Sequence, residues 1–208
     1  MSALTIIGLT GPSGAGKSTI AALFTERGIP VIDADRIYHA LLVPPSPCLD
    51  AIRKAFSDAV LHPDGTLNRK ALSALVFEDS DAGRERLSRL NAITHRFVIQ
   101  KTDEALAHYR AQGLPCVVID APLLIEAGMQ QGCDLTICVL APADVRIRRL
   151  MQRDGRSESE LRARVQAQPD DTFYRAHADA VIVNDGTATK EQLRARVNDI
   201  LAHREDPQ

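Results

Sequence analysis

Hydrophobic residues in this chain gather in five short and nearly unbroken runs, at 4–9, 29–33, 116–120, 135–140 and 180–184. The runs do not alternate with polar residues, and this pattern is typical of strands that are buried on both faces of a parallel sheet. Segments with apolar residues at helical spacing lie between them. The pattern therefore predicts an α/β fold, in which helices flank a five-stranded parallel sheet.

The second and third apolar runs are separated by far more chain than one crossover helix needs. Several amphipathic segments lie there, with a turn at 62–65 and Asn68 placed to cap a helix. We interpret residues 36–113 as a helical insertion that forms a second binding surface, although added bulk on one domain would give the same pattern. A smaller lid is predicted at 142–177. The core of this single unit is expected at about 1–35, 114–141 and 178–208.

The first apolar run leads directly into Gly-Pro-Ser-Gly-Ala-Gly-Lys-Ser at residues 11–18. This segment fits G-x-x-x-x-G-K-[ST] between a buried strand and a helix predicted at 17–27, which is the setting of a P-loop. Glycines permit unusual backbone angles, and N–H groups at a helix N-terminus attract phosphate. Lys17 would neutralise the β- and γ-phosphates, and the Ser18 hydroxyl would coordinate Mg²⁺. The residues expected to hold a nucleoside triphosphate are Gly11, Ser13, Gly14, Ala15, Gly16, Lys17, Ser18 and Thr19.

Two classes of P-loop protein compete for this site, a small-molecule kinase and a GTP-dependent switch. The chain has no N-K-x-D segment, with which GTPases read guanine, and no LSGGQ-like segment of the ABC ATPases. A kinase needs a carboxylate beside the acceptor hydroxyl and a flap that carries arginines. We favour a kinase, and the alternatives are a kinase for a nucleoside or nucleotide or a non-catalytic, nucleotide-gated binding module.

Three acidic residues near the ends of predicted strands are candidates for this chemistry. Asp33 ends the second apolar run, at the carboxyl edge where open α/β sheets bind ligands, and would accept or orient a proton. A helix N-cap is the alternative for Asp33, and for Asp35 capping is as plausible as ligand contact. Asp120 ends the third run and would bind Mg²⁺ through water, unless it is a buried structural acid.

Residues 144–164 carry seven arginines and four acidic residues, although the whole chain has a net charge of −2. Arg146, Arg149 and Arg153 fall on one face of a predicted helix. Such arginines can close over a phosphate in transfer, but a solvated basic helix would have the same sequence.

Charge, the length of apolar runs and cysteine spacing limit the partners and the location that we expect for this chain. A net charge of −2 does not favour a nucleic-acid partner. No apolar run approaches the ~20 residues of a membrane span and no secretory leader precedes the first strand, so we expect no membrane and a cytoplasmic location. The four cysteines form no CxxC pair and are expected to be reduced thiols. We expect a monomer or a weak homo-oligomer.

The motifs together resemble the dephospho-CoA kinase family through nearly the whole chain. The matching segments are GLTGPSGAGKST (8–19), VIDADRI (31–37), DGTLNRKALSALVF (64–77), LNAITH (90–95), APLLIEAG (121–128), RLMQRDG (149–155), AQ (167–168) and ADAVIVNDG (178–186). The resemblance implies a P-loop core with a helical CoA-binding part and a lid. It also implies transfer of the ATP γ-phosphate to the ribose 3′-hydroxyl of dephospho-CoA, with Mg²⁺, in the final step of coenzyme A synthesis.

The resemblance assigns roles to residues that the motifs match. Asp33 would be the base or the hydroxyl-orienting group, and Lys17, Arg149 and Arg153 would act on the transferred phosphate. Asn184 and Gly186 would lie beside the adenine. The residues expected to bind the acceptor are Asp35, Arg69, His95, Leu123 and Glu126.

The chain departs from the family pattern at three positions. Pro12 replaces a usual glycine and has no N–H for phosphate, but the N–H groups from Gly14 to Thr19 remain. Arg96 replaces a common proline, which leaves the local bend open. Arg146 stands where glutamine is common, so it is not credited with the family role.

Overall fold

The computed structural model describes residues 4–205, and their side chains as far as residue 202. Residues 1–3 and 206–208 of the predicted core lie outside this range. The chain divides into two compact units: one combines the chain up to Asp33 with the chain from Tyr109, and the other is Ala34–His108.

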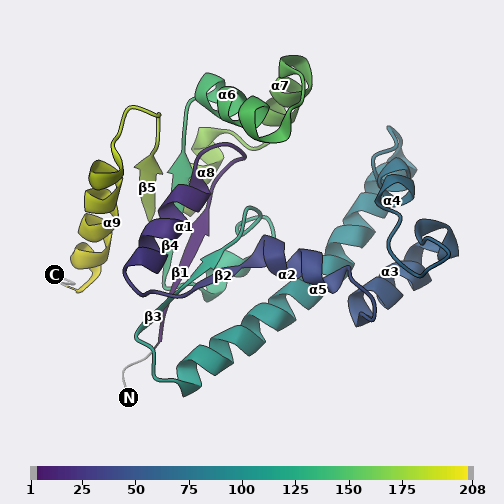
Figure 1. The fold of residues 1–208 in the computed structure, drawn as a ribbon, viewed down its shortest axis with the longest axis horizontal. Coiled ribbons are helices and arrows are strands. Elements are labelled where there is room, and N and C mark those ends of the chain that lie inside the picture. The colour runs from purple at the N-terminus through teal and green to yellow at the C-terminus, as the bar shows by residue number, and fades with distance from the viewer. Residues whose placement is uncertain (1–3, 206–208) are drawn as a thin grey trace. The chain divides into compact units, whose positions relative to one another are not determined.

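Five strands form one sheet, in which every neighbouring pair is parallel and the order is β2-β3-β1-β4-β5 (Figure 1). The predicted fold class is confirmed. The strands are β1 (Thr5–Thr10), β2 (Val31–Asp33), β3 (Cys116–Asp120), β4 (Leu135–Leu140) and β5 (Ala180–Val183). Strand β2 begins two residues later than predicted, because Pro30 has no N–H to donate to the sheet, although its carbonyl accepts from Val118 N at 2.9 Å.

Helices cover both faces of this sheet. On one face, Leu9 of β1 packs in a core with Phe24 of α1 (Lys17–Glu26) and Val197 of α9 (Lys190–Glu205). On the other face, Leu140 of β4 packs with Tyr174 of α8 (Asp171–His177). Burial on both sides explains why the strands read as continuous apolar runs.

The segment between β4 and α8 is a pair of helices, α6 (Ala143–Asp154) and α7 (Glu158–Gln166). They are held together by an apolar cluster of Ile147, Leu150, Leu161 and Val165. Helix α7 starts at a capping box, in which Ser157 and Glu160 satisfy each other's backbone N–H groups.

The unit of residues 34–108 is helical. Its helices are α2 (Ala34–Leu41), α3 (Pro47–Phe56), α4 (Arg69–Val76) and α5 (Asp81–Ala111), whose last residues belong to the other unit. Asn68 caps α4 as predicted, because its Oδ1 accepts from Ala71 N at 3.0 Å.

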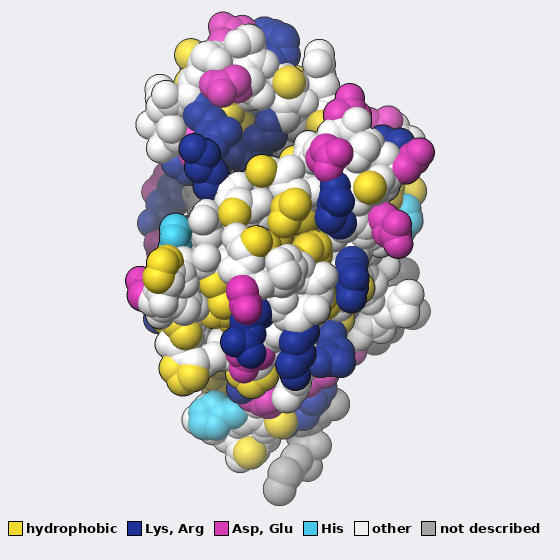
Figure 2. Space-filling model, turned by 90° about the vertical axis from the view of Figure 1, so that its right-hand side faces the viewer, with side chains coloured by type: hydrophobic (Ala, Val, Ile, Leu, Met, Phe, Trp, Pro, Cys, Tyr) yellow, Lys and Arg dark blue, Asp and Glu magenta, His cyan; other side chains and the backbone are white. Residues whose placement is uncertain are grey.

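The surface is mixed in charge. Figure 2 shows Lys and Arg side chains interspersed with Asp and Glu over the face that it draws, in keeping with a formal net charge of −2. Within residues 4–205, no helix combines the length and the apolar character that crossing a membrane requires.

Candidate active site

The glycine-rich loop follows β1, the central strand, which has β3 on one side and β4 on the other. Ligands of open α/β sheets bind where strand order diverges in this way, at the carboxyl ends of the strands. Helix α1 then begins at Lys17, with Gly16 as an N-cap that supplies no side chain and with no acidic residue in the first turn. The positive end of α1 is therefore not compensated by its own side chains and is suited to an external anion.

Hydrogen bonds within the loop narrow the set of N–H groups that can hold phosphate. The N–H groups of Ser13, Ala15 and Thr19 are donated to other atoms of the protein. In this conformation the N–H of Ala15 donates to Pro12 O and that of Thr19 to Gly16 O, and which N–H groups from Gly14 to Thr19 hold phosphate stays a prediction. The N–H groups that we expect to meet phosphate are those of Gly14, Gly16, Lys17 and Ser18.

Two positions of the loop need glycine for two reasons: their backbone angles are positive, and a side chain there would collide with a neighbouring atom. Gly14 has φ +81°, and a Cβ there would lie 2.7 Å from the carbonyl oxygen of Arg146 in α6. Gly16 has φ +94°, and a Cβ there would lie 2.1 Å from Nδ2 of Asn184, which follows β5. Both spacings are too short for a side chain, so the motif's glycines let the loop approach α6 and Asn184.

Lys17 and the two predicted acids of the sheet edge lie together. Lys17 Nζ forms an ion pair with Asp120 Oδ1, and only 17% and 11% of these side chains are exposed. The parallel register pairs Asp120 with Asp33 on the neighbouring strand, and Asp33 is exposed. Asp120 is buried, as expected if it were a structural acid. Its partner, however, is the P-loop lysine.

Arg149 binds the nucleotide loop directly. Its Nη1 donates to the carbonyl oxygens of Gly14 (3.3 Å), Ala15 (3.2 Å) and Asn184 (3.1 Å), and its Nη2 donates to Asn184 Oδ1 (3.2 Å). A Cβ on Gly186 would lie 3.5 Å from the same guanidinium. Arg149 of α6 therefore joins the P-loop to the segment after β5.

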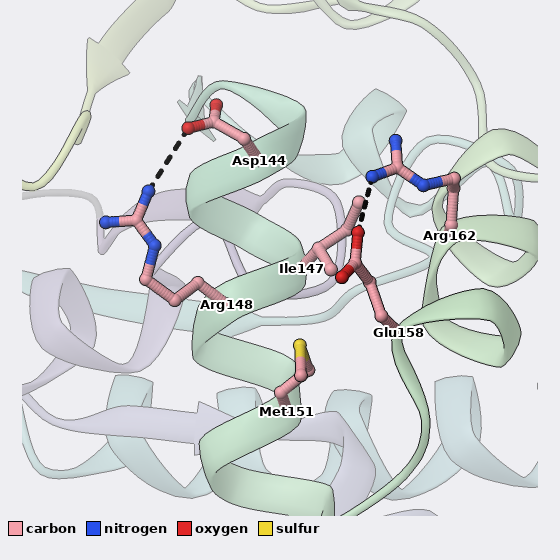
Figure 3. Close-up of a pocket in the computed structure, with 6 residues that line it drawn as sticks. All are labelled: Asp144, Ile147, Arg148, Met151, Glu158 and Arg162. Atoms are coloured by element: carbon pink, nitrogen blue, oxygen red, sulfur yellow. Dashed lines mark hydrogen bonds and ion pairs between the residues drawn. The ribbon is translucent and has the colours of Figure 1, made fainter.

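The other arginines of this region do not behave alike. Arg148 pairs with Asp144 at 3.2 Å and Arg162 with Glu158 at 2.6 Å, and all four side chains line one pocket (Figure 3). Arg153, predicted to act on phosphate, donates to Asp154 at 2.6 Å, and 61% of its side chain is exposed. Some arginines of residues 144–164 therefore lie on a solvated helix face, which was the alternative to a role on phosphate. The role of Arg153 stays a prediction.

Two residues contact the loop in ways that were not predicted: Arg146, considered only as one of a run of arginines that can close over phosphate, and Gln168. Arg146 is 5% exposed, and its Nε donates to Ser13 O at 2.9 Å. Gln168 Oε1 accepts from Ser13 N at 3.2 Å. Position 168 belongs to a matching family segment, but nothing in the sequence near it indicates that its partner lies 155 positions away.

Leu123 and Glu126, predicted to bind the acceptor, lie on the exposed side of the segment that follows β3. Glu126 is close enough to Tyr174 for its charge to act there. Burial, followed by the negative charge of Glu126, raises the pKa of Tyr174 to about 12. Tyr174 is therefore neutral at physiological pH and acts in the core as a packed aromatic ring.

The remaining predicted acceptor residues, Asp35, Arg69 and His95, belong to the unit of residues 34–108. Arg69 is exposed at the start of α4, and its Nη2 lies 3.5 Å from Nδ1 of His39 in α2. Burial raises the pKa of Tyr38, the charge of Arg69 lowers it, and the charge of Asp35 raises it again. Arg69 and Asp35 therefore both act on one part of α2, while His95 is half-buried on α5.

The residues present fit Mg²⁺ bound together with phosphate. Within the described part of the chain, no three His, Cys, Asp or Glu side chains form a metal-binding group. Mg²⁺ usually keeps several waters and takes one or two protein ligands beside phosphate oxygens. The exposed Ser18 hydroxyl and the Asp120 carboxylate, which would act through water, supply that limited donor set.

The parallel sheet, the loop after its central strand and the arginine helix docked on that loop define a P-loop kinase. Residues 5–190 match the family model described as dephospho-CoA kinase. A dephospho-CoA kinase of Anaeromyxobacter dehalogenans is 44% identical over 95% of this chain and 90% of its own length. This chain belongs to the dephospho-CoA kinase family.

Solved structures agree with this assignment. A Thermus thermophilus protein has a TM-score of 0.81 at 33% identity, covering 98% of this chain and 99% of its own. Dephospho-CoA kinase from Campylobacter jejuni has a TM-score of 0.68 at 25% identity, with coverage of 97% and 98%. The likeness therefore covers residues 34–108 and the helices α6 and α7 as well as the sheet.

Proposed function

We propose that this chain transfers the γ-phosphate of ATP to the 3′-hydroxyl of the ribose of dephospho-CoA, which gives CoA and ADP. The observation that carries the proposal is the ion pair of Lys17 and Asp120 beside Asp33, at the carboxyl edge of the sheet, in a chain of this family. These groups combine a cation for the triphosphate with an acid for a hydroxyl.

The nucleotide half of the reaction belongs to the loop and α1. When the triphosphate binds, Lys17 would leave Asp120 and pair with phosphate instead. Loop N–H groups would hold the non-bridging oxygens of the triphosphate. Ser18 and, through water, Asp120 would hold Mg²⁺, which would neutralise phosphate charge when bound. Asn184 and Gly186 would border the adenine.

The acceptor half depends on Asp33. Its exposed carboxylate would orient the 3′-hydroxyl and accept its proton as the oxygen attacks the γ-phosphorus. Because the transition state of phosphoryl transfer is loose, positioning matters more than strong basicity. Asp35, Arg69, His95, Leu123 and Glu126 would bind the rest of dephospho-CoA.

Arg149 and Arg153 would stabilise charge on the phosphate during transfer and help to exclude water, which would otherwise hydrolyse ATP. Arg149 starts from contacts with loop carbonyls and would exchange some of them for phosphate oxygens. Arg153 would leave Asp154.

The direct test is to incubate the purified chain with ATP, Mg²⁺ and dephospho-CoA and to weigh the products. We expect dephospho-CoA to gain one phosphate group at the ribose 3′ position while ATP becomes ADP. Parallel reactions with nucleosides and nucleoside monophosphates test the alternative that the chain is a kinase for a nucleoside or nucleotide. Phosphorylation of one of those acceptors in preference to dephospho-CoA would overturn the proposal, and so would ATP hydrolysis without any phosphorylated product.

A further inference from the structure

Ser13, at the tip of the P-loop, is bound through each of its polar groups by the segment of residues 142–177. Its N–H donates to Gln168 Oε1 at 3.2 Å, and its carbonyl oxygen accepts from Arg146 Nε at 2.9 Å. Its hydroxyl accepts from Gln168 Nε2 at 3.2 Å, and Arg164 Nη2 lies 3.4 Å away. Two side chains that are 22 positions apart thus meet on one loop residue.

Arg146 and Gln168 are also bound to each other. Arg146 Nη2 donates to Gln168 Oε1 at 2.6 Å, a short hydrogen bond whose donor is charged. Arg146 is only 5% exposed, and burying a guanidinium is costly unless hydrogen bonds hold it. These bonds therefore fix the direction of both side chains toward the loop.

The neighbouring loop residue is fixed by a different contact. The backbone of Gly14 packs so closely on α6 that a Cβ there would meet Arg146 O at 2.7 Å. The loop tip is thus held by side chains at Ser13 and by helix backbone at Gly14. Pro12 fixes its own φ and supplies no N–H, so this end of the loop provides shape rather than phosphate donors.

We propose that Arg146 and Gln168 are positioning residues that hold the P-loop in its phosphate-binding shape before ATP arrives. A loop with positive φ at Gly11, Gly14 and Gly16 has many alternative conformations, and selecting one in advance lowers the entropic cost of binding. The proposal rests on the proposed function only for the binding of ATP, since the acceptor does not enter it.

The test measures the Kd of ATP with Mg²⁺ by calorimetry, without acceptor, for the full chain and its variants. Gln168→Met keeps the size of the side chain and removes its bonds to Ser13 and Arg146. We expect binding to weaken about tenfold, which corresponds to about 1.4 kcal/mol. The matched control is Gln166→Met, an exposed glutamine two positions earlier, and we expect its Kd to equal that of the unchanged chain.

A second pair of variants tests whether the two residues act as one device. Arg146→Met should weaken ATP binding in the same direction, and the double variant should bind more tightly than the product of the two single effects predicts. In steady-state assays, KM for ATP should rise more than kcat falls, while KM for dephospho-CoA stays unchanged. A residue that only stabilises the fold would lower Tm without this split.

Gln168→Met with a Kd for ATP within twofold of the unchanged chain, measured well below its Tm, would overturn the proposal even if Tm were lowered. Single effects that multiply exactly in the double variant would also overturn it, because they would show independent roles. Since calorimetry needs no acceptor, failure of this proposal and failure of the proposed acceptor are separate results.

Discussion

The two units of this chain use charged side chains in different ways. In the unit that contains the sheet, Lys17 reaches Asp120 and Arg149 reaches Asn184, so the site joins segments that are far apart in the sequence. In the unit of residues 34–108, the pairs Arg53–Asp58, Arg84–Asp81, Arg86–Glu78 and Lys101–Glu104 each join residues at most eight positions apart and lie mostly in solvent. The nucleotide site is therefore assembled by contacts within the protein, whereas the candidate acceptor residues Asp35 and Arg69 are exposed and His95 is half-buried.

The comparison predicts its largest effect at Asp33, which ends the first of the two segments that form the sheet unit. Asp33→Asn keeps the shape of the side chain but removes the proton acceptor. We expect kcat to fall by about 10²-fold or more while the Kd of ATP stays unchanged. Fixed-time assays with dephospho-CoA measure kcat, and calorimetry measures the Kd of ATP. Asp103→Asn, an exposed acid on α5, is the control; unchanged kcat in Asp33→Asn would remove Asp33 from the chemistry.

A smaller effect should separate Arg149 from its neighbour Arg148. Arg149→Ala loses hydrogen bonds of a charged group to the loop and to Asn184, so kcat/KM for ATP should fall by about 10- to 100-fold. Arg148→Ala loses only an exposed pair with Asp144, and its kcat/KM should stay within about twofold. Equal losses in the two variants would contradict the division of α6 into a loop-facing side and a solvent-facing side.

In the helical unit we expect an effect on acceptor binding alone. Arg69→Ala should raise KM for dephospho-CoA about tenfold and leave KM for ATP unchanged, because an exposed cation would lose its bond to an anionic part of the acceptor. The matched control is Lys70→Ala, an adjacent exposed cation. A parallel rise of KM for ATP would mean that Arg69 serves the nucleotide instead.

The smallest effect concerns the local ion pairs of the helical unit. Arg84→Gln removes an exposed pair with Asp81 and should change the free energy of unfolding by less than about 0.5 kcal/mol. Leu90→Ala, a buried position of the same helix, should cost about 2–5 kcal/mol. Urea unfolding measures both. A loss in Arg84→Gln that approached the loss in Leu90→Ala would show that these surface pairs are structural.

The features that sequence predicts well are those encoded by neighbouring residues. The buried strands, the glycine-rich loop and the Asn68 cap each depend on a few adjacent residues, and the structure has all of them. The sequence also placed Asp33 and Asp120 at strand ends, but that these ends are paired follows from the strand order, which was not predicted.

Contacts that depend on tertiary packing could not be predicted. A run of arginines does not reveal that Arg146 is buried while Arg148 is exposed, because the distinction depends on where α6 meets Gly14. Nor does any local pattern direct Gln168 to Ser13, 155 positions away. Such pairings are decided by the packing of distant segments.

The acid-free first turn of α1 carries a warning for attempts to make this enzyme more thermostable. Placing Asp or Glu at the start of a helix is a routine stabilising substitution, worth a few tenths of a kcal/mol to about 1 kcal/mol. At Ser18 or Thr19 the same substitution would install a permanent tethered competitor, and the more it stabilised the fold, the more firmly it would shut out the incoming polyphosphate.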